Sequence, residues 1–408
     1  MNSTSAPYDV VVVGAALVGP ILAIALAHRG WRVQLLDTTP TERDPKTDTR
    51  PLALSQSSIR ILESLGLWQR IRAGATPIRM IHVSEAGRFA KVRLRAEQCG
   101  VEAFGYVVNA GDLAGVVHPA AEVSERVQWT RGVEKLAWQP VRDGAAFVGA
   151  VAGNGERLFR GSLAVLADSH TRAIEAVPVD VDERPYGQIA IACTLQTSSP
   201  NKGVAYERFT DKGPVALLPL GPSRSGLVWS IDASLGESMM ILSDAAFAEQ
   251  LRAAFGHWLG TLEVISPRVS FPLGLALSRV AENGLPLALV GNSAVRPHPV
   301  AGQGLNLALR DVAVLSDLLV DVQPDDGSLN GVNVASQFMR DRRNDRRRTQ
   351  HLTDSLVKGF GSALGPVRWA RASGLLVLSG APVLQRQFAR IAMGLSTPQS
   401  RLVRGFRP

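Results

Sequence analysis

Residues 9–37 read DVVVVGAALVGPILAIALAHRGWRVQLLD. The valine run after Asp9 predicts a buried strand, the apolar stretch to about His28 predicts a helix, and 31–36 predict a second strand that ends at Asp37. A strand, a helix and a strand within about thirty residues form a β-α-β unit, which predicts a parallel sheet.

The turn between the first strand and the helix is rich in glycine. Gly14 allows a tight turn and Gly19 allows close packing of the helix, so the unpaired N–H groups of the helix could hold a pyrophosphate. Asp37, 23 residues after Gly14, could accept hydrogen bonds from ribose hydroxyls. Ala16 replaces the middle glycine and should crowd the phosphate. Alone, this motif also fits a plain NAD dehydrogenase or a turn that binds no nucleotide.

A second motif, GNSAVRPHPVAGQGLN at 291–306, is far more specific. A strand delivers Asn292 to its carboxyl end, where ligands bind in such sheets. The following loop has little side-chain bulk and leads into a helix that begins near Leu305. The positive end of that helix could hold the pyrimidine edge of a flavin and stabilise negative charge on the reduced ring. His298, between two prolines, is better explained as fixing the loop than as a catalytic base.

Composition limits the other classes of function. The chain has 408 residues, of which 46% are hydrophobic, and its two cysteines, Cys99 and Cys193, can form neither a disulfide framework nor a cysteine metal site. No histidine spacing suggests a metal site, and a cytoplasmic location is expected. Six arginines and two aspartates between Arg340 and Arg348 account for much of the net charge of +8. We interpret them as a solvated helix face, with attraction to an acidic membrane as the alternative; no nucleic-acid module accompanies them.

The order of the elements predicts an α/β protein in which a Rossmann-like domain is interrupted by a β-rich substrate domain and followed by C-terminal helices. Apolar strands that end at Gly14, Asp168 and Asn292 are scattered along the chain, as such an insertion requires. The expected boundaries are 1–75, 101–178 and 285–335 for the three parts of the nucleotide domain, 76–100 and 179–284 for the substrate domain, and 336–408 for the helical region.

These motifs together resemble the para-hydroxybenzoate-hydroxylase-like flavoprotein monooxygenases. Within them the chain looks most similar to the ubiquinone-biosynthesis hydroxylases, in the 2-polyprenyl-6-methoxyphenol hydroxylase branch. The resemblance covers nearly the whole chain. The segments that carry it are 14–19, Asp37, 50–55 (RPLALS), Asp168, 205–214 (AYERFTDKGP), 291–311 and 353–357 (TDSLV).

The resemblance implies roles for residues that match the family pattern, all of them toward noncovalently bound FAD. Arg50 would lie along the phosphates, although it could instead pair with Asp44 or Asp48, and Asp168 would belong to the FAD site. The remaining implied FAD-site residues are Gly14, Ala16, Gly19, Asp37, Asn292, Pro299, Gly302, Gly304 and Asn306. Ala16 and Ser169 depart from the pattern, and Ser169 concerns a motif that is linked to both FAD and NAD(P)H.

The resemblance also implies an activity. NADH or NADPH, docking transiently, would reduce the flavin, and a flavin C4a-hydroperoxide would transfer an electrophilic OH to a polyprenylated phenol. No protein nucleophile is needed. The alternative is a non-catalytic subunit of a ubiquinone-biosynthesis complex that keeps the fold. A polyprenyl tail partitions into lipid, so the arginine stretch and the mixed apolar and basic residues of 367–391 suggest peripheral contact with the inner face of the membrane. The alternative is that these helices pack on the FAD domain with their arginines in water.

Overall fold

The computed structural model describes residues 8–38, 44, 47–88, 91–142, 144–152, 155–167, 174–299, 302–320, 322, 324, 329–361, 380–396 and 398–407. Its first layer is the parallel sheet that residues 9–37 predict. In space the strands follow the order β19, β11, β1, β2, β8, with every neighbouring pair parallel. Their bounds are β1 (Tyr8–Val13), β2 (Val33–Leu36), β8 (Val127–Thr130), β11 (Gly155–Leu166) and β19 (Leu287–Leu289).

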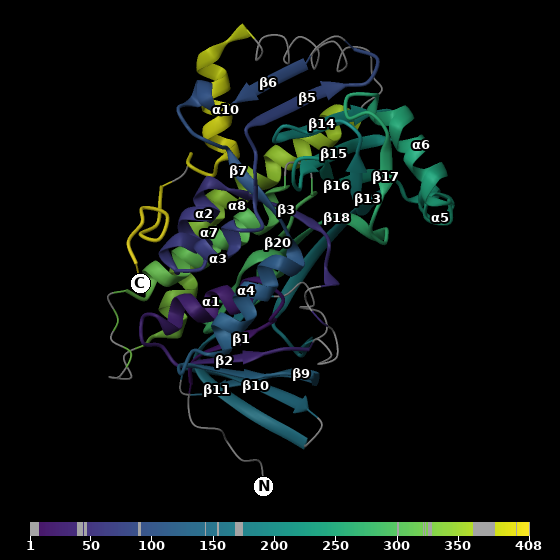
Figure 1. The fold of residues 1–408 in the computed structure, drawn as a ribbon. Coiled ribbons are helices and arrows are strands. Elements are labelled where there is room, and N and C mark those ends of the chain that lie inside the picture. Colours follow the sequence, from purple (N-terminus) through teal and green to yellow (C-terminus); the bar gives the residue numbers. More distant parts are fainter. Residues whose placement is uncertain are drawn as a thin grey trace.

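Helices cover one face of this sheet and a β-meander covers the other (Figure 1). Valines alternate between the two cores because successive side chains of a strand point to opposite faces: Val10 and Val12 pack under the helices, whereas Val11 and Val13 pack against the meander. The covering elements are α1 (Val18–Ala27), α4 (Ala110–Glu122), α7 (Gln303–Leu318) and α8 (Gly331–Gly361) on one side, and β9 (Val133–Arg142), β10 (Ala145–Ala152) and the short β12 (Ile174–Glu175) on the other.

Strand β11 belongs to both layers. Its first half, to Gly161, pairs antiparallel with β10, and its second half, from Gly161, pairs parallel with β1. Gly161 is required at this crossing because a Cβ there would lie 2.9 Å from Val11 Cγ2.

A second, nine-stranded sheet lies beyond the carboxyl ends of the parallel strands (Figure 1). Its order is β20, β18, β13, β16, β15, β14, β5, β6, with β17 paired to β13. The helices α5 (Gly236–Met240) and α6 (Asp244–Phe255) lie between strands of this sheet in the chain, and α6 packs on its outer face through Phe247 and Leu251. The strands are β5 (Met80–Glu85), β6 (Lys91–Arg95), β13 (Val179–Thr197), β14 (Val204–Thr210), β15 (Gly213–Pro219), β16 (Arg224–Asp232), β17 (Leu262–Val264), β18 (Val269–Val280) and β20 (Val295–Arg296).

A small third sheet joins the two large ones. Strand β7 (Gly105–Asn109) pairs with β3 (Pro51–Ser55) and with β4 (Thr76–Pro77). Gly66, which adopts a positive φ of 72°, separates α2 (Gln56–Ser64) from α3 (Trp68–Arg72). Near the C-terminus, α10 (Pro382–Ala392, yellow in Figure 1) packs beside β6 through Ala389. Short 3-10 turns occur at η2 (Glu97–Cys99), η4 (Ala233–Leu235) and η5 (Gly291–Ser293).

No helix in the described part of the chain is both long enough and apolar enough to cross a membrane. The α/β class with a β-rich insertion and C-terminal helices is confirmed, because the parallel sheet is assembled from distant segments and the second sheet from the strands between them.

Candidate functional site

A cavity of about 1550 Å³ connects the carboxyl ends of the parallel strands with the second sheet. Its volume exceeds the roughly 300–1,000 Å³ of ordinary ligand pockets, so it can hold a large ligand and a second molecule beside it. Of the residues chosen from the sequence, those that line it are Ala16, Asp37, Arg50, Asn292, Pro299, Gly302, Gly304 and Asn306. Asp168 and Ser169 lie outside the described residues.

The glycine turn closes one end of the cavity. Gly14 has a φ of 104° and its N–H donates to the Leu36 carbonyl (2.9 Å). A Cβ on Gly19 would lie 1.8 Å from the Gly14 carbonyl oxygen, so only glycine lets α1 start this close to β1. The first-turn amides of α1 have no intrahelical acceptor and can bind an anion. Ala16 is exposed and lines the cavity, so its methyl does not distort the turn.

An aromatic and basic group next to this turn was not anticipated from the sequence. The guanidinium of Arg131 lies 4.1 Å from the ring centre of Trp129, and His118 meets the same ring edge-on at 5.1 Å. His118 also bonds the Ala16 carbonyl through Nε2 (2.6 Å). All three residues line the cavity near Asp37, which is 7% exposed and follows β2. No local motif marks them, because they converge from α4 and from the end of β8.

Arg50 both pairs with Asp48 and lines the cavity, so its two predicted roles are compatible. It donates to Asp48 through Nε (2.9 Å) and Nη2 (2.6 Å), and it also lines the cavity beside that aspartate. The hydrogen bonds that Arg50 donates to Asp48 raise the pKa of its guanidinium above its already high ordinary value, so the side chain carries a fixed positive charge. Pairing with Asp48 therefore orients the guanidinium without removing it from the cavity wall.

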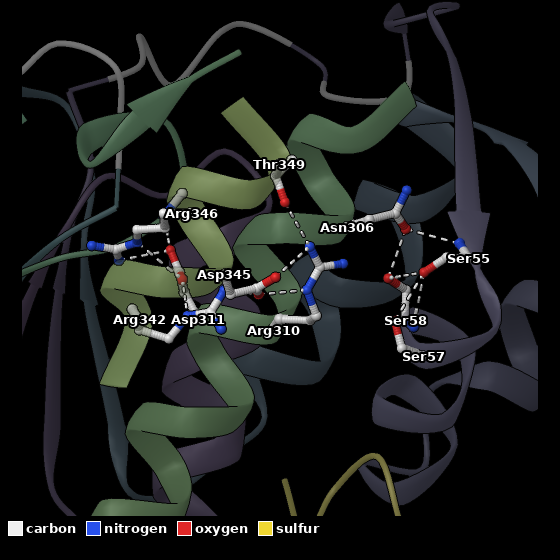
Figure 2. A network of polar contacts seen from close by, with 11 residues as sticks. Ser55, Ser57, Ser58, Asn306, Arg310, Asp311, Arg342, Asp345, Arg346 and Thr349 are labelled. Atoms are coloured by element: carbon white, nitrogen blue, oxygen red, sulfur yellow. Dashed lines mark hydrogen bonds and ion pairs between the residues drawn. The ribbon is translucent and has the colours of Figure 1, made fainter. Parts of the chain in front are cut away.

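Asn306 lines the cavity, and its side chain is also fully hydrogen-bonded to the protein. Its Oδ1 accepts from the Ser55 N–H (2.8 Å) and the Ser58 hydroxyl (2.7 Å) (Figure 2). Its Nδ2 donates to the carbonyls of Ala53 (2.8 Å) and Gly302 (2.7 Å). It is 2% exposed. This amide thus ties β3 and α2 to the start of α7.

The start of α7 faces the cavity with almost no side-chain cover. Gly302 caps the helix in the left-handed conformation, with a φ of 58°. Gly304 lines the cavity, and a Cβ added there would meet no protein atom within 4 Å. A ligand can therefore approach the positive end of this helix directly.

Buried ion pairs hold α7 against α8 (Figure 2). Asp311 accepts from Arg342 Nε (2.5 Å), from Arg346 Nη2 (2.9 Å) and from the Gly291 N–H (2.9 Å). Asp345 pairs with Arg342 (2.7 Å) and with Arg310 (2.9 Å). Through Gly291, the network fixes the turn that carries Asn292 into the cavity.

The prediction that the arginine stretch 340–348 is a solvated face is therefore wrong for two of its six arginines. Arg342 and Arg346 are 4% and 7% exposed, whereas Arg340, Arg343, Arg347 and Arg348 are exposed. Burial alone would raise the pKa of Asp311, but the charges of Arg346 and Arg342 outweigh it and hold that pKa below its ordinary value.

The sequence profile of the FAD binding domain family matches residues 7–337. The chain belongs to this FAD-binding family. It is 33% identical to the ubiquinone hydroxylase UbiL of Rhodospirillum rubrum, over 97% of this chain and 92% of the relative. It is 28% identical to the 3-demethoxyubiquinol 3-hydroxylase of Escherichia coli, over 96% and 100%. The crystal structure of the p-nitrophenol 4-monooxygenase PnpA of Pseudomonas putida superposes with a TM-score of 0.74 at 16% identity, covering 97% and 99% of the two chains.

The residues present fit FAD. Two helix N-termini, those of α1 and α7, open onto the same cavity, as the two ends of a dinucleotide require. Asp37, the first turn of α1 and Arg50 line this cavity and offer hydrogen-bonding groups for hydroxyls and phosphates, and Gly304 leaves an open face on its wall. The chain is an FAD-dependent monooxygenase of the ubiquinone-hydroxylase branch, with NAD(P)H as co-substrate. Of the two departures that motivate the non-catalytic alternative, Ala16 leaves the turn intact, and Ser169 lies outside the described residues.

Proposed function

We propose that this flavoprotein hydroxylates a polyprenylated phenol of ubiquinone biosynthesis. Overall, the phenol, O2, NAD(P)H and a proton give the hydroxylated phenol, NAD(P)+ and water. The names of the relatives support the ring system, because they act as ubiquinone and demethoxyubiquinol hydroxylases. The polyprenyl tail is what the family resemblance implies, and the apolar part of the cavity supports it.

The supporting observation is the apolar second half of the cavity. Beyond the start of α7, it is walled by one face of the second sheet and by α10. A ring with an alkyl tail could fill this chamber without leaving buried polar groups unpaired. Its apolar lining includes Ile81, Leu218, Phe271, Leu273, Phe388 and Ile391.

The described residues bind, orient and exclude water. The first turn of α1 and Arg50 would hold the phosphates of FAD, and the α7 N-terminus would stabilise negative charge on the ring. When bound, FAD supplies the electron transfer from NAD(P)H and the activation of oxygen that hydroxylation requires. The apolar walls keep water away from the reacting ring. The sequence offers only one β-α-β fingerprint, so we expect the nicotinamide to dock transiently; a nicotinamide retained through purification would contradict this.

The test is product analysis. The FAD-loaded protein is incubated with phenols that carry one to several isoprene units, together with NAD(P)H and oxygen. We expect NAD(P)H oxidation that depends on the phenol, and a product heavier by one oxygen atom. NAD(P)H oxidation that produces only hydrogen peroxide with every prenylated phenol would refute the proposed substrate class.

Peripheral membrane contact is the finer part of this proposal. One face of α10 lines the cavity through Phe388 and Ile391, while Val383 and Leu384 near its start are 64% and 42% exposed. Exposed Arg390 lies on the same helix. Such a helix can lie in a lipid interface and lead a tail from it into the chamber. The second half of the suspected contact segment, 380–391, is described, and 367–379 lie outside the described residues.

Co-sedimentation with liposomes tests this contact. We expect binding to anionic liposomes that weakens with salt, because charge attraction adds to apolar insertion. The double substitution Val383→Asp and Leu384→Asp should abolish this binding. The control substitution Val123→Asp should not, because Val123 is an apolar residue that is 80% exposed but lies at the end of α4 and not on α10. Equal and negligible binding to anionic and neutral liposomes would refute the contact without affecting the hydroxylase.

A further inference from the structure

The wall that the second sheet gives to the cavity contains one carboxylate in an otherwise alkyl surface. Across neighbouring strands the register places Val92, Val83, Glu207, Ala216 and Val228 in one row. All five line the cavity. Their neighbours along each strand point to the opposite face, where those of β15 and β16 pack under α6.

Glu207 has no structural partner that would explain its burial. Its carboxylate makes no hydrogen bond or ion pair with another described residue. Among the described residues that line the cavity from β5, β6, β14, β15 and β16, it is the only acid or base apart from Tyr206, whose ring packs on Phe255 and Trp258. Burying a lone carboxylate costs free energy, so a purely structural role would favour an alkyl side chain.

Its surroundings set its proton affinity. Burial raises the pKa of Glu207 from 4.5 to about 7, with no charged neighbour contributing. The residue is still partly accessible, and because it lines the cavity, that access is to a ligand there. From α10, the opposing residues are the apolar Phe388, Ile391 and Ala392. The other charged residues of this half, Glu183, Arg184 and Arg296, come from β13 and β20, and Arg296 pairs with Glu183 (2.9 Å).

We propose that Glu207 is the catalytic base that receives the proton of the substrate's phenolic hydroxyl. This inference rests on the proposed function. The phenol O–H bond breaks, its electron pair stays on the phenol oxygen, and the proton bonds to a carboxylate oxygen of Glu207. The resulting phenolate ring is richer in electrons and reacts faster with an electrophilic oxygen. A base titrating near the working pH suits this transfer.

The test compares three isosteric or conservative variants in the FAD-loaded full chain. Glu207→Gln removes the base, Glu207→Asp keeps a carboxylate, and Glu263→Gln makes the same change at an exposed position of β17 in the same sheet. The probe is 2-methoxyphenol with one isoprene unit at carbon 6. The quantity measured is kcat/KM for the hydroxylated product between pH 5.5 and 9.

In the wild type we expect kcat/KM to rise with pH and to level off above about 7, where the carboxylate is ionised and can accept the proton as the ring reacts. Glu207→Gln should lower kcat/KM by about 100-fold and should lose the inflection near pH 7. Glu207→Asp should recover part of both, and Glu263→Gln should behave as the wild type.

A Glu207→Gln variant that keeps the wild-type rate and pH profile would overturn the assignment, as would an equal loss in Glu263→Gln. The two proposals fail differently. A wild-type protein that forms no hydroxylated product from any prenylated phenol would refute the proposed function. Hydroxylation with the same rate and pH profile in the wild type and in Glu207→Gln would refute only the role of Glu207.

Discussion

The buried ion pairs between α7 and α8 allow a quantitative prediction for Asp311→Asn. The substitution keeps the shape but replaces a carboxylate that faces Arg342 and Arg346, both less than 8% exposed. The network holds three arginines and two aspartates, a net charge of +1, which the substitution raises to +2. Removing one partner of a buried pair costs about 3–5 kcal/mol, mostly because the remaining charge stays buried. At about 2 °C per kcal/mol for a large domain, Tm should fall by about 6–10 °C.

Thermal unfolding at pH 7, followed by circular dichroism and by flavin fluorescence, measures the effect. Asp341→Asn is the matched control: Asp341 lies on α8 too, but it is exposed and only accepts from Gln337 (2.8 Å), so its loss should cost no more than about 0.5 kcal/mol. Adding Arg342→Met to Asp311→Asn should recover part of the loss, because it restores the net charge. If Asp311→Asn destabilises the protein no more than Asp341→Asn does, the charge argument is wrong.

Three further predictions concern the cavity. Gly19→Ala should destabilise the protein and abolish FAD retention, because its Cβ would overlap the Gly14 carbonyl. In contrast, Gly304→Ala should leave the stability of the FAD-free protein unchanged or higher by up to about 1 kcal/mol, but should weaken FAD binding in calorimetry. Normal FAD binding by Gly304→Ala would show that the flavin does not lie there. Asn306→Ala leaves buried backbone groups without hydrogen-bond partners and should lower the free energy of unfolding by about 2–4 kcal/mol, with loss of FAD affinity. Denaturant unfolding with and without FAD measures both effects. A loss of stability alone would limit the role of Asn306 to folding. Glu207 binds its proton more tightly in the folded chain, with a pKa of about 7 against 4.5, so the stability of the wild type should fall as pH rises through that window. Glu207→Gln should therefore be more stable than the wild type by about 3 kcal/mol above pH 7 and equal to it below pH 4.5. A difference in stability that does not change with pH would contradict the burial of an ionisable group.

Local features were predictable and long-range ones were not. The β-α-β unit could be read from residues 9–37 because its contacts lie close together in the chain. Arg342 and Arg346 were interpreted as solvated because charge alone was considered, although the spacing of Arg342, Asp345, Arg346 and Thr349 places them on one helical face. That spacing could have indicated burial, but the sequence does not show that Asp311 on another helix supplies the counter-charge.

The same limit applies within the site. Asn306 lines the cavity as expected, but three of its four hydrogen bonds reach residues more than 200 positions away, namely Ser55, Ser58 and Ala53. Glu207 was part of a recognised motif without a role. Only the strand register shows that its neighbours on the same face are alkyl groups.

The α7–α8 ion pairs also show that the end of the family match is not the end of the folding unit in this chain. Similarity to the FAD binding domain family ends at residue 337, five positions before Arg342. A protein truncated at that point would keep Asp311 in its apolar surroundings without either counter-ion, and the turn at Gly291 would lose the carboxylate's fixed orientation. The end of the family match and the end of the segment needed for stable folding are therefore different residues. Any exchange of this domain between relatives would have to include α8.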